Sequence, residues 1–276
     1  MDTITKVADD KSEALTARYG ADALPPAGPW NETIAVLLGH RSVRSFLPTP
    51  VPVGTLETMI AAAQSASTSS NLQAWSVVVV SDPAKRKELA RIAANQKHIE
   101  QCPLYMVFIA DLSRLERIGT RHGTGTNGLP WTETFLVAAV DAALAAQNAV
   151  TAAESLGLSM VYIGAMRNDP PAVARLLDLP PGAFGIFGLC IGYADPAAKA
   201  EVKPRLPQLA ILHHETYKQE GESELIARYD ETLGAFSRRQ NMPVDSWTTR
   251  IKQRIAAITG REKMRGWLNA LGFPLR

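Results

Sequence analysis

The pattern of apolar and polar positions divides the chain into helical and extended segments. Apolar residues recur three and four positions apart within 31–47 and 56–63, a spacing that gives a helix one apolar face. Continuous apolar runs at 75–81, 104–110 and 184–193 are typical of strands buried on both sides, and 160–164 is a shorter strand. The chain is therefore expected to contain both helices and strands.

Two Asp-Pro pairs predict where helices begin. Asp82-Pro83 and Asp169-Pro170 each offer a capping carboxylate followed by proline, which suits the first helical turn. We therefore expect helices to Ile92 and to Leu177. Beyond residue 211 the chain becomes more polar, and its periodicity predicts helices over 224–236 and 247–258.

The longest predicted helix, 135–158, is rich in alanine and ends at Gly157. It is apolar, but Asp141, Gln147 and Asn148 lie within it, so we expect a buried helix and not a membrane span. Small side chains allow close packing, which suits the centre of a fold or a subunit interface. We predict that Ala145 and Ala149 face the partner in a homodimer.

Composition narrows the functional classes. The 276 residues carry 29 basic and 27 acidic side chains, a net charge of +2, which gives no general argument for nucleic acid or an anionic membrane. Cys102 and Cys190 are too few for a disulfide framework and lack metal-ligand spacing. The N-terminus has no apolar signal core, so we expect a cytoplasmic protein.

The segment 40–44, His-Arg-Ser-Val-Arg, combines two guanidiniums, an imidazole and a hydroxyl. Arg41 and Arg44 are three positions apart, so they share a face if this segment is a helical turn. Paired guanidiniums suit a phosphate, because each planar fork gives two parallel charge-assisted bonds. A solvated basic turn is the alternative.

Other segments could complete a ligand site. The polar loop 65–73 holds four serines, a threonine, an asparagine and a glutamine. Lys203 and Arg205 lie on a proline-fixed extended segment, and Gly164-Ala165 offers a bare backbone after a strand. The irregular stretch 111–134 contains three glycines but no Gly-Lys-Ser/Thr ending, so we interpret it as a mobile surface loop and not a phosphate loop.

No paired carboxylates, no Ser-His-Asp arrangement and no metal cluster emerges from the sequence. Polar loops, two cationic segments and a bare strand end indicate instead a flat, phosphorylated cofactor. That cofactor would perform the chemistry, and the protein would position it.

The chain resembles the FMN-dependent nitroreductase superfamily, in the branch of the oxygen-insensitive NADPH nitroreductases and flavin reductase P. The resemblance rests on ordered motifs at 40–44, 67–73, 96–98, 153–158, 162–164, 187–192 and 203–207. It implies an α+β fold, in which a mixed and mainly antiparallel sheet has helices on both faces. It also implies an intertwined homodimer with FMN as cofactor and NADPH or NADH as co-substrate. The implied function is ping-pong transfer of a hydride to nitroaromatics, quinones or free flavin.

The resemblance also implies a role for each matching position. No side chain is catalytic, because the hydride chemistry takes place on FMN. The phosphate and ribityl chain would be held by His40, Arg41, Ser42, Arg44, Lys203 and Arg205. The ring would be lined by Thr68, Ser69, Gln73, Gln96, Tyr162, Ile163, Gly164 and Ala165.

Two departures from the family pattern affect this interpretation. Ala165 replaces a usual second glycine. Arg238 and Arg239 could bind NADPH from a loop between two helices, but Pro243 and Val244 stand where further arginines are usual. The preference between NADPH and NADH therefore stays open, as do two alternatives: a flavoenzyme with one dedicated substrate, such as a dehalogenase or specific flavin reductase, and a non-catalytic flavin-binding protein.

The predicted organisation is an N-terminal arm at 1–30, an FMN-binding core at 31–210 and a helical excursion at 211–276 that covers the cofactor side. The expected partners are a second copy of the chain and a small-molecule electron acceptor.

Overall fold

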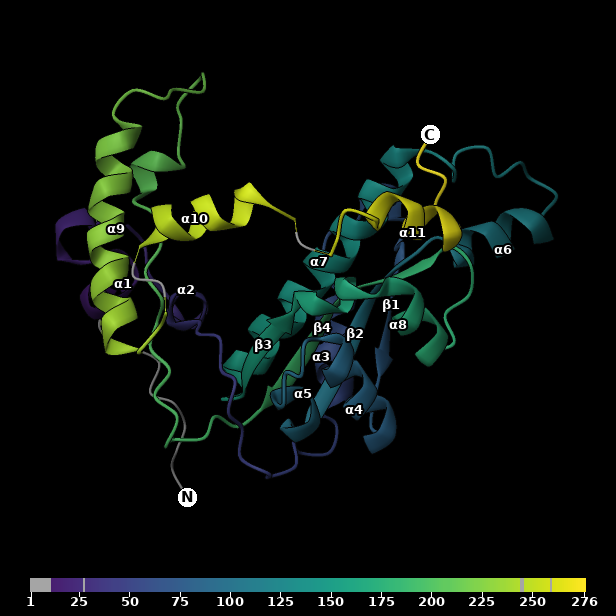
Figure 1. Ribbon diagram of the computed structural model, residues 1–276, viewed down its shortest axis with the longest axis horizontal. Helices are drawn as coiled ribbons and strands as arrows, with labels where there is room; N and C mark the ends of the chain where they lie inside the picture. Colours follow the sequence, from purple (N-terminus) through teal and green to yellow (C-terminus); the bar gives the residue numbers. More distant parts are fainter. Residues whose placement is uncertain (1–10, 27, 244–245, 259) are drawn as a thin grey trace. The chain divides into compact units, whose positions relative to one another are not determined.

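The computed structural model describes residues 11–26, 28–243, 246–258 and 260–276. It divides into two compact units (Figure 1). Unit 1 comprises residues 1–41 and 196–258, and unit 2 comprises 42–195 and 259–276. The functional division expected from the sequence, at residues 30 and 210, stays a prediction.

Unit 2 is built on a four-stranded sheet in the order β1-β2-β4-β3. The strands are β1 (Trp75–Val79), β2 (Leu104–Asp111), β3 (Ser159–Ile163) and β4 (Ala183–Gly192). Every neighbouring pair is antiparallel, and an isolated parallel bridge joins Ser42 to Met160. The predicted α+β class is confirmed. The strand at 75–81 was expected to be buried on both sides, but β1 lies at an edge of the sheet and is only half buried.

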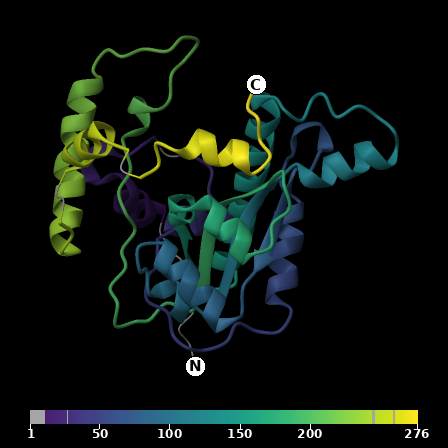
Figure 2. The ribbon, with the colours of Figure 1, turned by 45° about the vertical axis from the view of Figure 1, so that its right-hand side comes forward.

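Helices cover both faces of this sheet (Figure 2). On one face, α3 (Thr55–Gln64) and α7 (Thr132–Ser155) pack in a core with Met106 and Phe108 of β2. On the other face, α8 (Pro170–Leu176) approaches Gly185, where a methyl group would meet Val173 at 3.2 Å. The predicted Asp-Pro caps are confirmed, because Asp82 begins α4 (Pro83–Ile92) and Asp169 begins α8.

Helix α7 carries its alanines inward. Of the described helices, it alone is long and apolar enough to cross a membrane, yet eight of its residues are buried in this chain. Ala145 and Ala149 are fully buried in the chain's own core, so the prediction that they face a partner subunit is wrong. The exposed apolar side chains of α7 are Leu136, Val140 and Leu144.

The stretch 111–134, expected to be an irregular loop, contains α6 (Ser113–Arg121). Asp111 ends β2 and also begins this helix, since its Oδ1 accepts from the N–H of Ser113 at 3.0 Å and of Arg114 at 3.4 Å. A capping residue hidden at the end of a strand gives little signal in the sequence.

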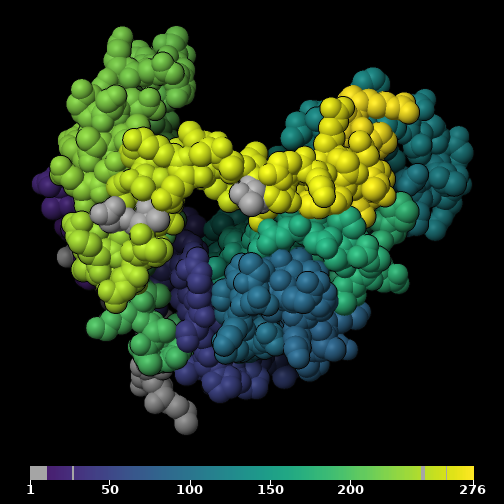
Figure 3. Space-filling view, in the orientation of Figure 1, coloured from purple at the N-terminus to yellow at the C-terminus, as the bar shows by residue number. Residues whose placement is uncertain are grey.

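The C-terminal segment completes unit 2. Helix α11 (Met264–Ala270) and the residues after it lie against the start of α7, as the yellow and teal atoms show (Figure 3). Leu268 and Phe273 pack in a core with Phe184, and Arg276 exchanges backbone hydrogen bonds with Pro130 and Thr132. A short helix, α5 (His98–Gln101), follows α4.

Unit 1 is helical. Its helices are α1 (Lys11–Tyr19), α2 (Glu32–Gly39), α9 (Glu222–Arg239) and α10 (Trp247–Ala256). Tyr229, Leu233 and Phe236 of α9 form its small core, against which Trp247 packs. The first ten residues of the predicted arm lie outside the described residues.

Candidate functional site

The basic segment 40–44 follows α2 but is not helical. His40 ends the helix with extended backbone angles, Ser42 forms a parallel bridge to Met160, and the Val43 N–H donates to the Met160 carbonyl at 2.9 Å. The expectation that Arg41 and Arg44 share a face of a helical turn is therefore wrong. Extended chain alternates instead, so Val43 is buried while Ser42 and Arg44 on either side are exposed.

Within unit 2, Arg44 has His98 as an electrostatic neighbour. Burial, and secondarily the charge of Arg44, lower the pKa of His98 below its ordinary value, so the imidazole is neutral at pH 7. Its Nε2 is buried and has no hydrogen-bond partner among the described residues. A buried polar atom with no protein partner is what a ligand contact would explain. Gln96, the predicted ring contact, lies half buried two residues earlier.

Within unit 1, Lys203 and Arg205 lie on the extended segment before η4 (Gln208–Ala210). The Lys203 ammonium lies 5.7 Å from the ring centroid of Phe236, a cation–π contact. The exposed Arg205 guanidinium donates to the Lys203 carbonyl at 3.2 Å and borders a cavity of about 550 Å³ with Tyr19 and Tyr229. These cations meet the chemical requirement for binding a phosphate.

The polar loop between α3 and β1 is held by Asp141, a side chain that the sequence analysis did not assign to the site. The Asp141 carboxylate accepts from the Thr68 hydroxyl at 2.5 Å, the Ser69 N–H at 3.1 Å and the Ala74 N–H at 3.1 Å. Thr68 in turn accepts from the Gln73 N–H at 3.0 Å. Asp141 is 2% exposed, and an aspartate among the alanines of a mainly apolar helix was the available signal.

This loop has an unusual backbone. Ser70, Asn71 and Gln73 all have positive φ, at 49°, 53° and 48°. Each such residue stores strain unless its surroundings compensate, and such strain is concentrated at functional sites. Asp141 supplies the compensation, since its three accepted bonds fix both ends of the strained turn.

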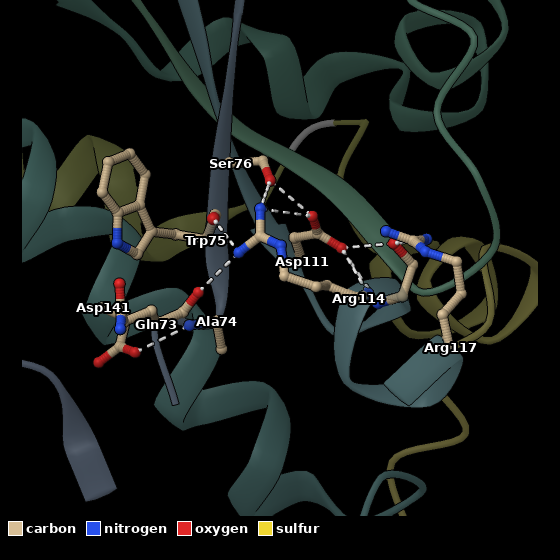
Figure 4. Close-up of polar contacts among 9 residues, drawn as sticks. Gln73, Ala74, Trp75, Ser76, Asp111, Arg114, Arg117 and Asp141 are labelled. Carbon is tan, nitrogen blue, oxygen red and sulfur yellow. Dashed lines mark hydrogen bonds and ion pairs between the residues drawn. The ribbon is translucent and has the colours of Figure 1, made fainter. Parts of the chain in front are cut away.

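A second clamp holds the strand end of the same loop (Figure 4). Arg114 of α6 donates from Nη1 to the carbonyls of Gln73 at 3.1 Å and Trp75 at 3.3 Å, and from Nη2 to the Ser76 hydroxyl at 2.7 Å. Asp111 accepts from Ser76 at 2.6 Å.

The same carboxylate has a perturbed pKa. Burial is the largest influence on Asp111 and would raise the pKa, but hydrogen bonds from Ser113 and Ser76 and the charge of Arg114 outweigh it. The pKa of Asp111 therefore lies below its ordinary value, and the clamp is fully charged at neutral pH.

The segment 162–165, predicted to lie along a flat ring, has mixed exposure. Tyr162, Gly164 and Ala165 are half exposed, but the Ile163 side chain is 1% exposed and belongs to the core. Tyr162 packs edge-on against Phe187 at 5.0 Å between ring centroids. Gly164 begins η3 (Gly164–Asn168), and a methyl group on it would lie 3.3 Å from the Arg167 guanidinium. Arg261 donates to the Gly164 carbonyl at 3.3 Å and fixes this turn.

Arg238 and Arg239 were expected in a loop between helices, and that expectation is wrong. They form the last turn of α9, and Arg239 pairs with Glu201 through Nε at 3.2 Å and Nη2 at 3.1 Å. Arg238 is exposed. Val244, one of the positions where the family usually has arginine, lies outside the described residues.

Other chemistry is sparse in the described part of the chain. No group of three or more His, Cys, Asp or Glu side chains there could hold a metal ion. Cys102 and Cys190 are free and buried.

Comparisons with known proteins give the site its context. The nitroreductase family model matches residues 37–193, and the model of the C-terminal domain of that family matches 203–276. An oxygen-insensitive NADPH nitroreductase of Salmonella typhimurium is 41% identical over 223 residues, covering 80% of this chain and 90% of the relative. An FMN reductase (NADPH) of Bacillus subtilis is 40% identical over 213 residues, covering 76% and 85%.

The fold agrees with the sequence match. The structure of the NADPH:FMN oxidoreductase of Vibrio harveyi in complex with NAD⁺ superposes with a TM-score of 0.80 at 36% identity, covering 89% of this chain and all of that one. Together, the two family matches span both units and every predicted site position. The chain belongs to the nitroreductase family.

Proposed function

We propose that this protein is an FMN-dependent oxidoreductase that uses NAD(P)H to reduce nitroaromatics, quinones or free flavin. The observation that carries the proposal is the match of both family segments, 37–193 and 203–276, to one chain. The names of its relatives support it, since they include an NADPH nitroreductase, an FMN reductase and, from a Pseudomonas strain, a Cr(VI) reductase. The range of acceptors in these names favours broad specificity over a single dedicated substrate.

The residues present suit FMN. The bound cofactor would supply the redox chemistry, accepting a hydride from NAD(P)H and passing it to the acceptor in two alternating half-reactions (ping-pong). The chain would bind the phosphate end with the cations of its two basic segments, His40, Arg41, Arg44, Lys203 and Arg205. The hydroxyls and amides of Ser42, Thr68, Ser69, Gln73 and Gln96 would meet polar atoms of the ribityl chain and ring.

The face of the ring would lie along Tyr162, Gly164 and Ala165, and Ile163, which is 1% exposed, would support this segment from the core. The Thr68 hydroxyl donates its hydrogen bond to Asp141, so toward a ligand it can only accept one. The pKa of Tyr162 is raised, chiefly by burial and secondarily by Glu154, so the phenol stays neutral and serves as a donor and not as a base. We assign no catalytic acid or base, because protons can come from water.

The test is a flavin spectrum followed by an anaerobic titration. The purified protein should show flavin absorbance that NADPH or NADH bleaches under argon, and that a nitroaromatic, a quinone or FMN restores. Protein without flavin absorbance after reconstitution with FMN would refute the proposal. Flavin that NAD(P)H does not bleach would identify a carrier. Absorbance that only one class of acceptor restores would identify an enzyme with a dedicated substrate.

The phosphate contacts have a separate test. A charge-assisted bidentate contact is worth about 1.5–3 kcal/mol, or roughly 10- to 150-fold in affinity. Arg44→Ala and Arg205→Ala should therefore purify with depleted FMN, whereas Arg265→Ala, an exposed arginine outside the proposed site, should not. Full FMN retention by both site variants would contradict the assignment.

The proposal includes a homodimer acting in the cytoplasm. The support for the dimer within this chain is the exposed apolar stripe of α7, where Leu136, Val140 and Leu144 recur every four residues and are 51%, 54% and 42% exposed. Water-exposed leucine and valine at helical spacing are typical of a helix that packs against a second chain. Cell fractionation and sedimentation would test the compartment and the dimer.

A further inference from the structure

Arg18, in the last turn of α1, is a buried arginine with 5% exposure. Its Nη2 donates to the carbonyl oxygens of Leu38 at 2.7 Å and His40 at 2.8 Å, and its Nη1 donates to the Lys203 carbonyl at 2.7 Å. Burying a guanidinium is costly unless its donors are satisfied. Here three of its five N–H donors make short bonds to the backbones of two segments that are more than 160 positions apart in the sequence.

The backbone of Arg18 contributes another contact. Its carbonyl accepts from the Arg205 N–H at 2.9 Å, so Arg18 binds the 203–205 segment through both its side chain and its main chain. The carbonyls of Leu38 and His40 lie at the C-terminal end of α2, where helix carbonyls lack internal partners and the helix dipole favours a cation. Arg18 therefore caps α2 and ties its end to the extended segment.

These two segments carry cations with a proposed function: His40 and Arg41 on one, Lys203 and Arg205 on the other. Like charges repel, so cations that must meet one phosphate need a rigid support. Because the Arg18 donors are directed at carbonyls, Arg18 supports the cations without competing for their ligand. The cavity that Arg205 borders is also lined by Tyr19, the next residue of α1.

Given the proposed FMN site, we propose that Arg18 is a positioning residue for the phosphate end of the cofactor. It holds 38–40 and 203–205 at a fixed spacing, so that cations from both can engage one phosphate group. Arg18 precedes residue 37, where the family match begins, so this support lies in the N-terminal arm and not in the matched region.

The test separates binding of the phosphate from binding of the ring. Arg18→Lys keeps the charge, but a single ammonium cannot reproduce the planar fork that reaches three carbonyls. The full-length protein is titrated with FMN and with riboflavin, which lacks the phosphate. We expect Arg18→Lys to weaken FMN binding about 10-fold or more and riboflavin binding less than about twofold. Arg254→Lys, the same change at an exposed site on α10, should alter neither.

An equal loss of affinity for FMN and riboflavin would show that Arg18 has only a structural role. Unchanged FMN affinity would also overturn the inference. Arg18→Ala is the harsher variant, and Arg18→Lys gives the answer if the alanine variant does not fold. Arg205→Ala, titrated in parallel, separates this inference from the proposed function. If Arg205→Ala loses affinity for FMN but not for riboflavin, and Arg18→Lys does not, the phosphate site is supported and the role of Arg18 is refuted. If Arg205→Ala and Arg44→Ala also keep FMN, both the phosphate site and the role of Arg18 are refuted.

Discussion

The Thr68 hydroxyl donates to the Asp141 carboxylate at 2.5 Å across 73 positions of sequence. This contact joins the loop that carries three predicted site residues to α7, the longest helix packed on the sheet. It means that the polar side chains of the loop are arranged by a carboxylate buried behind them.

Replacing Asp141 with asparagine should destabilise the protein and loosen the loop. In Asp141→Asn, an NH₂ group replaces one of two oxygens that together face three donors, so a donor is set against a donor. We expect the free energy of unfolding to fall by about 1.5–3 kcal/mol, with weaker FMN binding. Urea titration and FMN equilibrium dialysis measure the two effects.

Asp169→Asn is the matched control. Asp169 caps α8 through the Ala172 N–H at 3.1 Å, and asparagine caps a helix about as well as aspartate. Its stability and FMN content should be close to those of wild type. If Asp141→Asn behaves in the same way as this control, the loop does not depend on the buried carboxylate.

The stability contribution of Asp111 should depend on pH with a defined sign. Its pKa in the folded protein lies below the ordinary value of 3.8. The contribution is therefore fully present above the unfolded value and is lost as the pH falls through the folded value. The difference in unfolding free energy between wild type and Asp111→Asn should be constant near neutral pH and shrink below about pH 4.

The measurement is urea unfolding of both proteins at several pH values. A difference that stays constant to about pH 2, or grows on acidification, would mean that the folded pKa is not depressed. Because Arg114 holds Gln73 and Trp75 beside Asp111, the protection of loop amides against exchange, measured relative to the intrinsic rate at each pH, should fall over the same acidic range.

The sequence predicted the local features well. Asp82 and Asp169 begin helices as expected, because a cap is decided by neighbours within a few residues. The errors come from distant contacts. Segment 40–44 is extended because it bridges to Met160. The edge position of β1 depends on the order in which strands pair, and the sequence of one strand does not show that order. Arg18, Asp141 and Glu201 act on partners that no local pattern identifies.

The homodimer is tested on the exposed stripe of α7. Val140→Glu or Leu144→Glu should give monomer on sizing, because each would bury an unpaired charge at the proposed interface. If the family's site lies between subunits, FMN is lost with the dimer. Val53→Glu, at a fully exposed position, is the control. A dimer unaffected by either stripe variant would place the interface elsewhere.

If Arg239 binds the 2′-phosphate of NADPH, its ion pair with Glu201 should limit the preference for NADPH over NADH. In the free chain its guanidinium is paired at 3.1 Å, with both side chains about half exposed, so an incoming 2′-phosphate must compete with the carboxylate. If Arg238 and Arg239 bind that phosphate, Glu201→Gln should raise the kcat/KM ratio of NADPH to NADH, and Arg238→Ala/Arg239→Ala should lower it by roughly 5- to 30-fold. The maximal rate with saturating acceptor should change little in either variant.

Steady-state kinetics with both cofactors measure the ratio, and Glu88→Gln, which removes an exposed ion pair with Arg91 on α4, is the control. Equal effects on NADPH and NADH, or opposite signs to those expected, would remove both arginines from the cofactor site.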